Sequence, residues 1–236
     1  MTQQLETSRR TPLNRARVLE AAVALADEVG LEALSMRRLA EALGVVPMAL
    51  YKHVANKDEL LDGMVDVVIG EIAPVAAGAG WKNAVRLRVL SARQALLRHP
   101  WVRQALETRT NRTPAVLKYT DEVIGMFLAG GFSIDLTHHV MHALGSRMWG
   151  FTQELFDAAA GGPEAVMPPE AQAAMLQEMA QRYPNILEVA GVARHDDGSV
   201  VSYGCDDQFE FEFALDLMLD GFERLHGRDW SSRRGQ

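Results

Sequence analysis

Cysteine is almost absent from this chain, which has a single one, Cys205, among 236 residues. One thiol excludes an intrachain disulfide and fits a reducing compartment. The chain also lacks an apolar run of the ~18 residues that a membrane-spanning helix needs, and it has no basic-then-apolar signal at its N-terminus. We therefore expect a soluble protein of the cytoplasm that makes no membrane contact.

Signatures of catalysis and of cofactor binding are missing as well. There is no Ser-centred glycine elbow, no phosphate-cradling loop and no dinucleotide fingerprint. His138 and His142 have a spacing that can chelate a transition metal, but no third ligand accompanies them, and His139 stands where a zinc protease needs glutamate. Two aspartates follow Cys205 and disfavour a reactive thiolate. We predict no enzyme activity, no catalytic residues, no cofactor and no metal site.

The charge is unevenly distributed along the chain. The formal net charge is −7 and the pI is about 5.5, which argues against a generic nucleic-acid binder. Residues 1–57 nevertheless carry eight Lys/Arg against six Asp/Glu, a balance of +2, and the remainder carries −9. This pattern is compatible with one modest basic face. Arg9 and Arg10 belong to a polar tail, residues 1–10, which is either a disordered arm near a duplex or a solvated tail without function.

The most informative segment is SMRRLAEALGVVPMALYKHVANKDELL, residues 35–61. Ser35 is a good N-cap, Gly44 supplies a left-handed helix end, and Pro47 suits a first helical position. The segment therefore predicts two short helices joined by a tight turn, the second spanning 47–53 and held by Ala49, Leu50 and Val54. Asn56 and Glu59 form a capping box for a following helix, 57–72, with a buried stripe of Leu61, Val65, Val68 and Ile72.

A further helix precedes this segment. It is predicted to start at Thr11 and Pro12 and to end at Gly30, with an apolar face of Val18, Ala22, Leu25, Ala26 and Val29. Three helices with a tight turn between the last two are what a protein needs to insert one helix into the major groove of DNA. We expect a helix-turn-helix domain over residues 1–56 and a second domain over residues 57–236 that begins with the linking helix 57–72.

The run GLEALSMRRLAEALGVVPMALYKHVANKDELLDGMV closely resembles the N-terminal domain of the tetracycline-repressor (TetR) family over roughly residues 12–72. The motifs LLRHP (Leu96 to Pro100), GGFSID (Gly130 to Asp135) and FEFALDLMLDGFERL (Phe211 to Leu225) are similar to the branch near the tetracycline repressor itself. The resemblance implies an all-α fold, with a three-helix DNA-binding domain and a larger helical domain for ligand binding and dimerisation.

The resemblance also implies roles for single residues. Arg37 matches a base-reading position, and Arg can bond both acceptors of guanine. The apolar side chains that open the recognition helix suit thymine methyl groups, and the basic ones suit phosphates. Tyr51 could instead pack inside the domain, and His53 could hold the turn. The predicted DNA contacts are Arg37, Pro47, Met48, Ala49, Tyr51, Lys52, His53 and Lys57.

Residues 81–225 are predicted to be almost entirely helical. The expected helices span 81–98, 114–129, 133–160, 169–182 and 207–225, and Pro100 stops the first of them. Alternating apolar residues at 200–203 mark a possible short strand.

Two of these helices carry an apolar seam at a spacing typical of four-helix bundles. Two helices from each of two subunits would form an isologous homodimer; the alternative is that both seams are internal core. The predicted interface residues are Met141, Leu144, Met148, Phe151, Leu155, Phe211, Leu215, Met218, Phe222 and Leu225.

A homodimer would bind a palindromic double-stranded operator, and the resemblance implies release by a small-molecule effector. The histidines through which the tetracycline repressor engages drug and metal align with Ala73 and Leu106, so a different, partly apolar effector is expected. Candidate pocket residues, each of which could instead be plain core, are Trp101, Met126, Phe127, His138, His142, Trp149, Met175 and Met179. Two alternatives remain: an architectural or activating DNA-binding protein without an inducer, and a helical ligand-binding or enzymatic domain with a vestigial head.

Overall fold

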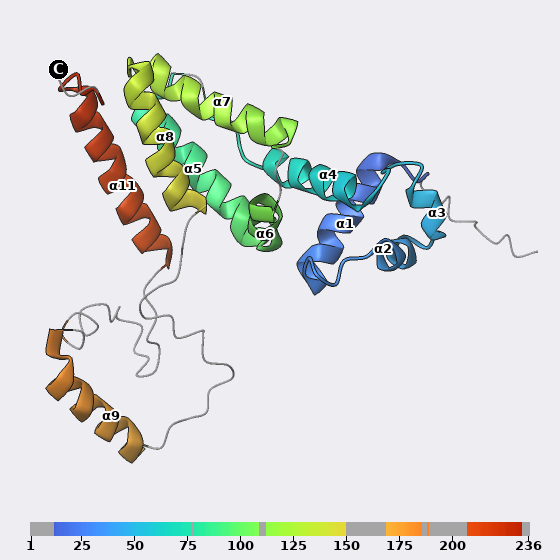
Figure 1. Cartoon of the computed structure of the whole chain (residues 1–236), viewed down its shortest axis with the longest axis horizontal. Helices are drawn as coiled ribbons and strands as arrows, with labels where there is room; N and C mark the ends of the chain where they lie inside the picture. Colours follow the sequence, from blue (N-terminus) through green and yellow to red (C-terminus); the bar gives the residue numbers. More distant parts are fainter. Residues whose placement is uncertain are drawn as a thin grey trace, which may run out of the picture. The chain divides into compact units, whose positions relative to one another are not determined.

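The computed structural model describes residues 12–76, 78–108, 112–149, 169–185, 188 and 207–232. Within these ranges the regular structure is entirely helical, which confirms the predicted all-α fold (Figure 1). None of the described helices is long and apolar enough to span a membrane. The helices are α1 Arg15–Val29, α2 Met36–Leu43, α3 Pro47–Leu50, α4 Lys57–Gly70, α5 Trp81–Arg98, α6 Trp101–Thr108, α7 Pro114–Ala129, α8 Ile134–Trp149, α9 Pro169–Arg182 and α11 Asp207–His226.

The chain divides into two compact units. The first comprises Met1–Trp149 and Gly221–Gln236, and the second comprises Gly150–Asp220. The described part of the second unit consists of α9 and the larger part of α11. The predicted domain boundary near residue 56 lies inside the first unit and stays a prediction.

The first unit begins with α1, whose start differs from the sequence prediction. The side chain of Asn14 accepts a hydrogen bond from the backbone N–H of Arg17 at 2.8 Å, so the helix begins at residue 15 and not at Thr11 or Pro12. Gly30 ends the helix at φ 78° as predicted. The buried face differs in part, since Leu25 and Val29 are half-buried. The buried residues are Val18, Leu19, Ala22, Val23 and Ala26.

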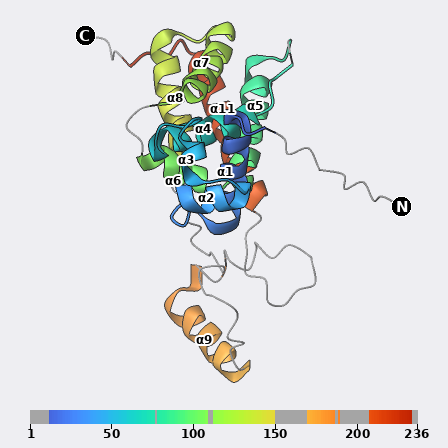
Figure 2. The ribbon, with the colours of Figure 1, turned by 90° about the vertical axis from the view of Figure 1, so that its right-hand side faces the viewer.

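Helix α4 packs closely against α1. A Cβ placed on Gly63 of α4 would lie 2.6 Å from Cδ2 of Leu19, so glycine is what allows the two helices this approach. Val65, Val68 and Ile72 are buried as predicted, whereas Leu61 is half-buried. In both views of the ribbon, α1, α2 and α3 lie together beside α4 (Figure 1, Figure 2).

The helices that follow α4 agree with the prediction except at one point. Helices α5, α7 and α9 have the predicted bounds, and Ser133 caps α8 by accepting from Leu136 N–H at 3.1 Å. Helix α6 was not predicted, because Pro100 was interpreted only as the stop of α5. A proline also suits the position just before a new helix. The expected continuation of α8 to residue 160 and the possible strand at 200–203 lie outside the described residues.

An aromatic cluster forms the core where α5 begins and α7 ends. The ring centroids of Trp81 and Phe132 are 4.6 Å apart, those of Phe127 and Phe132 are 5.2 Å apart, and those of Phe127 and Phe222 are 6.1 Å apart. Such edge-to-face pairs add to the free energy gained by burial alone. Gly130 is required beside this cluster, since a Cβ there would lie 2.6 Å from Trp81.

Candidate DNA-binding surface and its connection to the C-terminal helices

The turn between α2 and α3 has the predicted geometry. The Ser35 hydroxyl accepts from Arg38 N–H at 3.2 Å and caps α2. Gly44 takes the left-handed conformation at φ 65° and ψ 36°, and the next N–H, of Val45, donates back to the carbonyl of Ala40 at 2.9 Å. A residue with a Cβ adopts this conformation only at a cost, so Gly44 fixes the angle at which α3 leaves α2.

Helix α3 is a single turn anchored at its far end. It spans Pro47–Leu50, shorter than the predicted 47–53, with the proline at its first turn. The chain continues as a turn in which His53 N–H donates to the Leu50 carbonyl at 2.8 Å. Leu50 is fully buried and Val54 is 1% exposed, whereas Ala49 is half-buried. Two of the three predicted anchors therefore hold this segment in place.

The predicted DNA contacts lie mostly on the surface. Met48 is 71% exposed and Tyr51 is 44% exposed, so Tyr51 is not a core side chain. Ala49 and His53 are half-buried. The remaining exposed members of the set are Arg37, Pro47, Lys52 and Lys57.

Two arginines near the start of α2 are positioned differently. The Arg37 guanidinium donates from Nε to Glu41 Oε1 at 2.9 Å, one turn along α2, and the side chain is 85% exposed. This pair must open before Arg37 can reach a base, which costs little at such exposure. Arg38 donates instead to the Ala33 carbonyl at 3.3 Å.

The start of α4 is capped as predicted, with one difference in the reciprocal bond. Asn56 Oδ1 accepts from Glu59 N–H at 2.8 Å, but the Glu59 carboxylate accepts from Ala55 N–H at 2.7 Å and not from the N–H of Asn56. Lys57 is thereby fixed as the first residue of α4.

The other end of α4 is bound to α5 and α7 through a buried arginine. The guanidinium of Arg88 donates to the carbonyls of Ile72 and Ala73 at 3.0 and 2.7 Å, and it also pairs with Glu122. It lies 5.0 Å from the ring centroid of Tyr119. Burial raises the pKa of the Tyr119 hydroxyl well above its ordinary range, although Arg88 acts in the opposite direction. The two carbonyl groups that follow α4 thus accept their hydrogen bonds from a side chain of α5.

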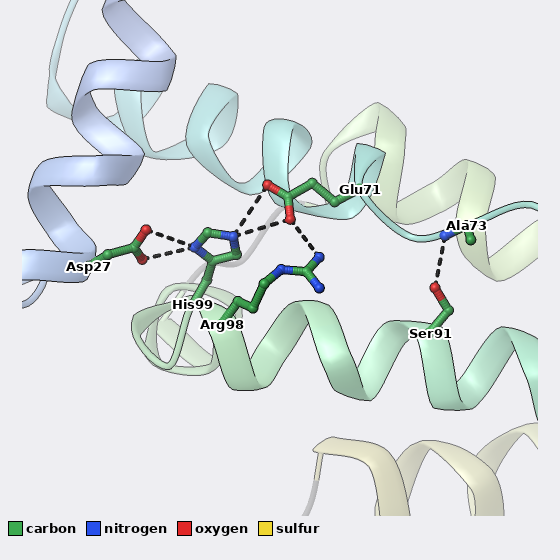
Figure 3. A network of polar contacts seen from close by, with 6 residues as sticks. All are labelled: Asp27, Glu71, Ala73, Ser91, Arg98 and His99. Carbon is green, nitrogen blue, oxygen red and sulfur yellow. Dashed lines mark hydrogen bonds and ion pairs between the residues drawn. The ribbon is translucent and has the colours of Figure 1, made fainter.

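A second set of contacts joins α1, the end of α4 and the α5–α6 junction (Figure 3). The imidazole Nδ1 of His99 lies 2.8 and 2.9 Å from the two carboxylate oxygens of Asp27, and Nε2 lies 3.2 Å from both oxygens of Glu71. Arg98 donates to Glu71 at 2.7 Å, and the indole N–H of Trp101 donates to Asp27 at 2.7 Å. We call these five residues the His99 network. In the sequence, His99 stands out only as part of the LLRHP motif. No neighbouring residue indicates that its two partners lie far away along the chain.

Close by, the chain after α4 is held once more, since Ala73 N–H donates to the Ser91 hydroxyl of α5 at 2.8 Å (Figure 3). The C-terminal end of α4 therefore bonds to α5 through three side chains: Arg88, Ser91 and Arg98.

The predicted pocket residues do not share one environment. Phe127 is fully buried in the aromatic cluster, and Trp101 is 6% exposed with its N–H bound to Asp27. His138 and His142 are exposed on α8, and their role in a pocket stays a prediction. Met126 and Met179 are half-buried, and the side chains of Trp149 and Met175 lie outside the described residues.

In the described ranges no three His, Cys, Asp or Glu side chains converge on a point that could hold a metal ion. The rings of His138 and His142 are 4.7 Å apart, as their spacing suggested. Cys205 lies outside the described residues.

The predicted dimer seam requires correction. Leu144 (3% exposed) and Phe222 (7%) are buried and belong to the first unit, and Phe211 (4%) and Leu215 (0%) of the second unit are buried as well. The spacing of Leu144 and Phe222 therefore reflects internal core, the alternative considered above. Each helix has more than one apolar stripe, and spacing alone does not say which stripe faces inward. Met141, Met218 and Leu225 are half-buried, and Met148, Phe151 and Leu155 fall among residues or side chains that are not described.

Other apolar side chains of the same helices are exposed. Ile134 on α8 is 82% exposed. On α11, Phe209, Phe213 and Leu217 recur every four residues and are 54%, 54% and 57% exposed. Exposed apolar side chains in a row are typical of a surface that another protein covers.

A capped helix-turn-helix on a small helical head, joined through one helix to further helices, defines a DNA-binding regulator. Residues 18–64 match the family described as bacterial regulatory proteins, tetR family, and residues 73–226 match the tetracyclin repressor-like C-terminal domain. The chain belongs to the tetR family of bacterial regulatory proteins.

Individual relatives agree with this assignment. The chain is 31% identical over 228 residues to the HTH-type transcriptional repressor DrrR1 of Streptomyces coeruleorubidus, covering 93% of this chain and 79% of that protein. It is 37% identical over 127 residues to an HTH-type transcriptional regulator of Saccharopolyspora erythraea, a match that spans 53% of this chain and 54% of the relative. The structure of ActR from Streptomyces coelicolor with (S)-DNPA is similar at 25% identity and a TM-score of 0.65, covering 92% of this chain and all of that one.

Proposed function

We propose that this protein is a transcriptional repressor that binds a palindromic operator as a homodimer and is released from it by a small-molecule effector. It acts in the cytoplasm and has no enzymatic activity. The observation that carries the proposal is the exposed tip of the head: Met48 and Tyr51 point to solvent beside a buried Leu50 that anchors them. An exposed surface on a rigidly anchored short helix is suited to reading a groove.

The contacts divide into base readers and phosphate contacts. Arg37 at the start of α2 reads a base, and the apolar side chains of Pro47, Met48 and Ala49 meet thymine methyl groups. Lys52 and Lys57, with Tyr51 and His53, bind the backbone and fix the register of the head without reading sequence themselves.

Dimerisation gives the two heads a fixed separation. Two recognition helices enter successive major grooves only when they are held about 34–36 Å apart, or at a multiple of that distance. We propose that the exposed stripe of α11, Phe209, Phe213 and Leu217, and the exposed Ile134 of α8 lie in this interface. The buried seam residues do not take part.

Effector release acts through α4. Its first residue, Lys57, contacts DNA in this proposal, and the residues after its last turn are bonded to α5. A ligand that binds among the C-terminal helices and favours a different position of α4 changes the separation of the heads, provided that it binds the two arrangements with different affinity. Because Ala73 stands after α4 where the resemblance places a tetracycline-binding histidine, we expect a different, partly apolar effector.

The proposal is tested by selecting bound sequences from random duplexes with the purified full-length chain near physiological salt, because salt strongly affects such affinities. Recovery of a palindrome with two half-sites supports the proposal. Salt-sensitive binding without a consensus would instead indicate an architectural protein.

A further inference from the structure

His99 faces two carboxylates at once, one from the DNA-binding head and one from the end of α4. Its Nδ1 lies 2.8 and 2.9 Å from the oxygens of Asp27, and its Nε2 lies 3.2 Å from those of Glu71 (Figure 3). The imidazole is nearly enclosed, with the side chain 11% exposed. The two carboxylates are more open, at 30% for Asp27 and 34% for Glu71.

His99 can donate hydrogen bonds to both carboxylates at once only when both of its ring nitrogens carry a hydrogen. Ionised carboxylates only accept hydrogen bonds, and a neutral imidazole donates from one nitrogen while the other presents a lone pair. Only the imidazolium donates to Asp27 and Glu71 together. A neutral His99 would keep one contact and turn a lone pair toward the other carboxylate.

We propose that His99 is a positioning residue that couples the head to the C-terminal helices, and that operator binding is linked to its protonation. The inference rests on the proposed operator-binding function. Asp27 belongs to α1 of the head, Glu71 follows α4, and His99 joins α5 to α6. The imidazolium thus connects α1 of the head with the end of α4 and with the α5–α6 junction, which would respond to an effector.

The surrounding charges allow this connection to open without unfolding the protein. Glu71 keeps its bond from Arg98 of α5, and Asp27 keeps its bond from the Trp101 indole of α6. The ion pair between Arg103 and Glu107 on α6 lies within that helix. Loss of the proton therefore removes the polar connection between Asp27 and Glu71 through His99, while both carboxylates retain another donor and α1 stays packed on α4.

Because proton binding and operator binding are thermodynamically linked, the proposal can be tested without the effector. If protonation of His99 changes the affinity for operator, operator binding must change the proton affinity of His99 by the same factor. The dissociation constant of the full-length protein for the selected operator duplex is measured at constant ionic strength from about pH 5 to 8, where histidine side chains titrate.

For the wild type we expect the dissociation constant to change on the order of tenfold across this range, within the usual span of allosteric couplings. His99→Gln, which cannot be protonated, should remove most of that change, and Asp27→Asn should reduce it. His139→Gln is the matched control, because His139 also lies near a carboxylate, Asp135 at 3.8 Å, but within one helix. Any pH dependence that arises at other groups is common to all variants and cancels in the comparison.

Five results would overturn the inference. His99→Gln could retain the full pH dependence, His139→Gln could reduce it equally, or both network variants could lose their helical circular dichroism, which would make the network a folding requirement only. A wild type that binds operator equally at every pH would also contradict it, while leaving the proposed function intact. A wild type that binds no duplex would instead overturn the proposed function and this inference together.

Discussion

At the scale of single residues, Arg88 and Arg98 show how burial decides what a charge contributes. Both guanidinium groups bond to the end of α4, but the Arg88 side chain is 8% exposed and that of Arg98 is 52% exposed. Removal of a buried partner leaves carbonyls and a carboxylate without their donors, whereas an exposed pair is replaced by water.

We therefore expect Arg88→Ala to lower the free energy of unfolding by about 3 kcal/mol, near the lower end for a broken buried pair because Glu122 is partly exposed. Arg98→Ala is the control and should cost about 0–1 kcal/mol. Urea denaturation of both variants measures the difference. Equal losses would contradict this account of the α4 connection.

Arg37 and Lys57 form a second matched pair, one proposed to read a base and the other to bind a phosphate. Arg37→Ala should weaken binding to the operator by about 1–3 kcal/mol and leave binding to random duplex almost unchanged. Lys57→Ala should weaken both alike and reduce the slope of log affinity against log salt by about one contact. Filter binding on both duplexes measures these effects, and equal loss on both by Arg37→Ala would reject its base-reading role.

At the scale of elements, the packing of α1 on α4 depends on the missing side chain of Gly63. A Cβ there would lie 2.6 Å from Leu19, whereas a Cβ on Gly125, in the interior of α7, would meet nothing within 4 Å. Alanine is favoured over glycine inside a helix by about 0.5–1 kcal/mol. Gly125→Ala should therefore stabilise the protein by that amount.

Gly63→Ala gains the same helix propensity but overpacks the contact with Leu19, at a cost of about 1–3 kcal/mol. It should be neutral or destabilising. Thermal unfolding of the two alanine variants checks the difference in sign, and equal stabilisation by both would show that α1 and α4 do not pack as described.

The His99 network also predicts how stability depends on pH. Burial raises the pKa of the Glu71 carboxyl, but the hydrogen bonds from Arg98 and His99 outweigh it, so the pKa is lower than usual. A carboxyl with a lowered folded-state pKa stabilises the protein above its unfolded pKa of about 4.3, and this stability is lost as the pH falls through the folded value. Glu71→Gln should flatten the loss of stability below about pH 4.3. Urea midpoints across acid pH measure it, and an unchanged acid limb would contradict the assignment.

Elements whose signals are local could be predicted from the sequence. Ser35, Gly44, Pro47 and Asn56 act within four residues of themselves, and all four lie where the sequence placed them. Helix α6 was missed because one proline can end a helix or precede one. The contacts of His99 were missed because its partners lie 72 and 28 residues away.

At the scale of the whole molecule, apolar spacing alone could not predict which apolar stripe of a helix is buried. Phe213 and Phe222 lie on one helix, yet the first is 54% exposed and the second is 7% exposed beside Phe127. A period of 3.6 places both in plausible stripes, and only tertiary packing separates them.

We predict that Phe213→Asp yields a folded monomer, because it places a charge in the proposed interface. Phe222→Asp should instead unfold the protein, since it buries an unpaired charge in the aromatic cluster. Sedimentation velocity and circular dichroism distinguish the two outcomes. A folded dimer of Phe213→Asp would place the interface elsewhere.

In the proposed function, a dimer reads two half-sites at a fixed separation. The most direct test compares the affinity for the selected operator with that for the same half-sites moved apart by about five base pairs, half of a ~10 bp helical turn. We expect the shifted duplex to bind no better than a single half-site, because the two heads cannot face both grooves at once. Equal affinity for the original and shifted duplexes would contradict it.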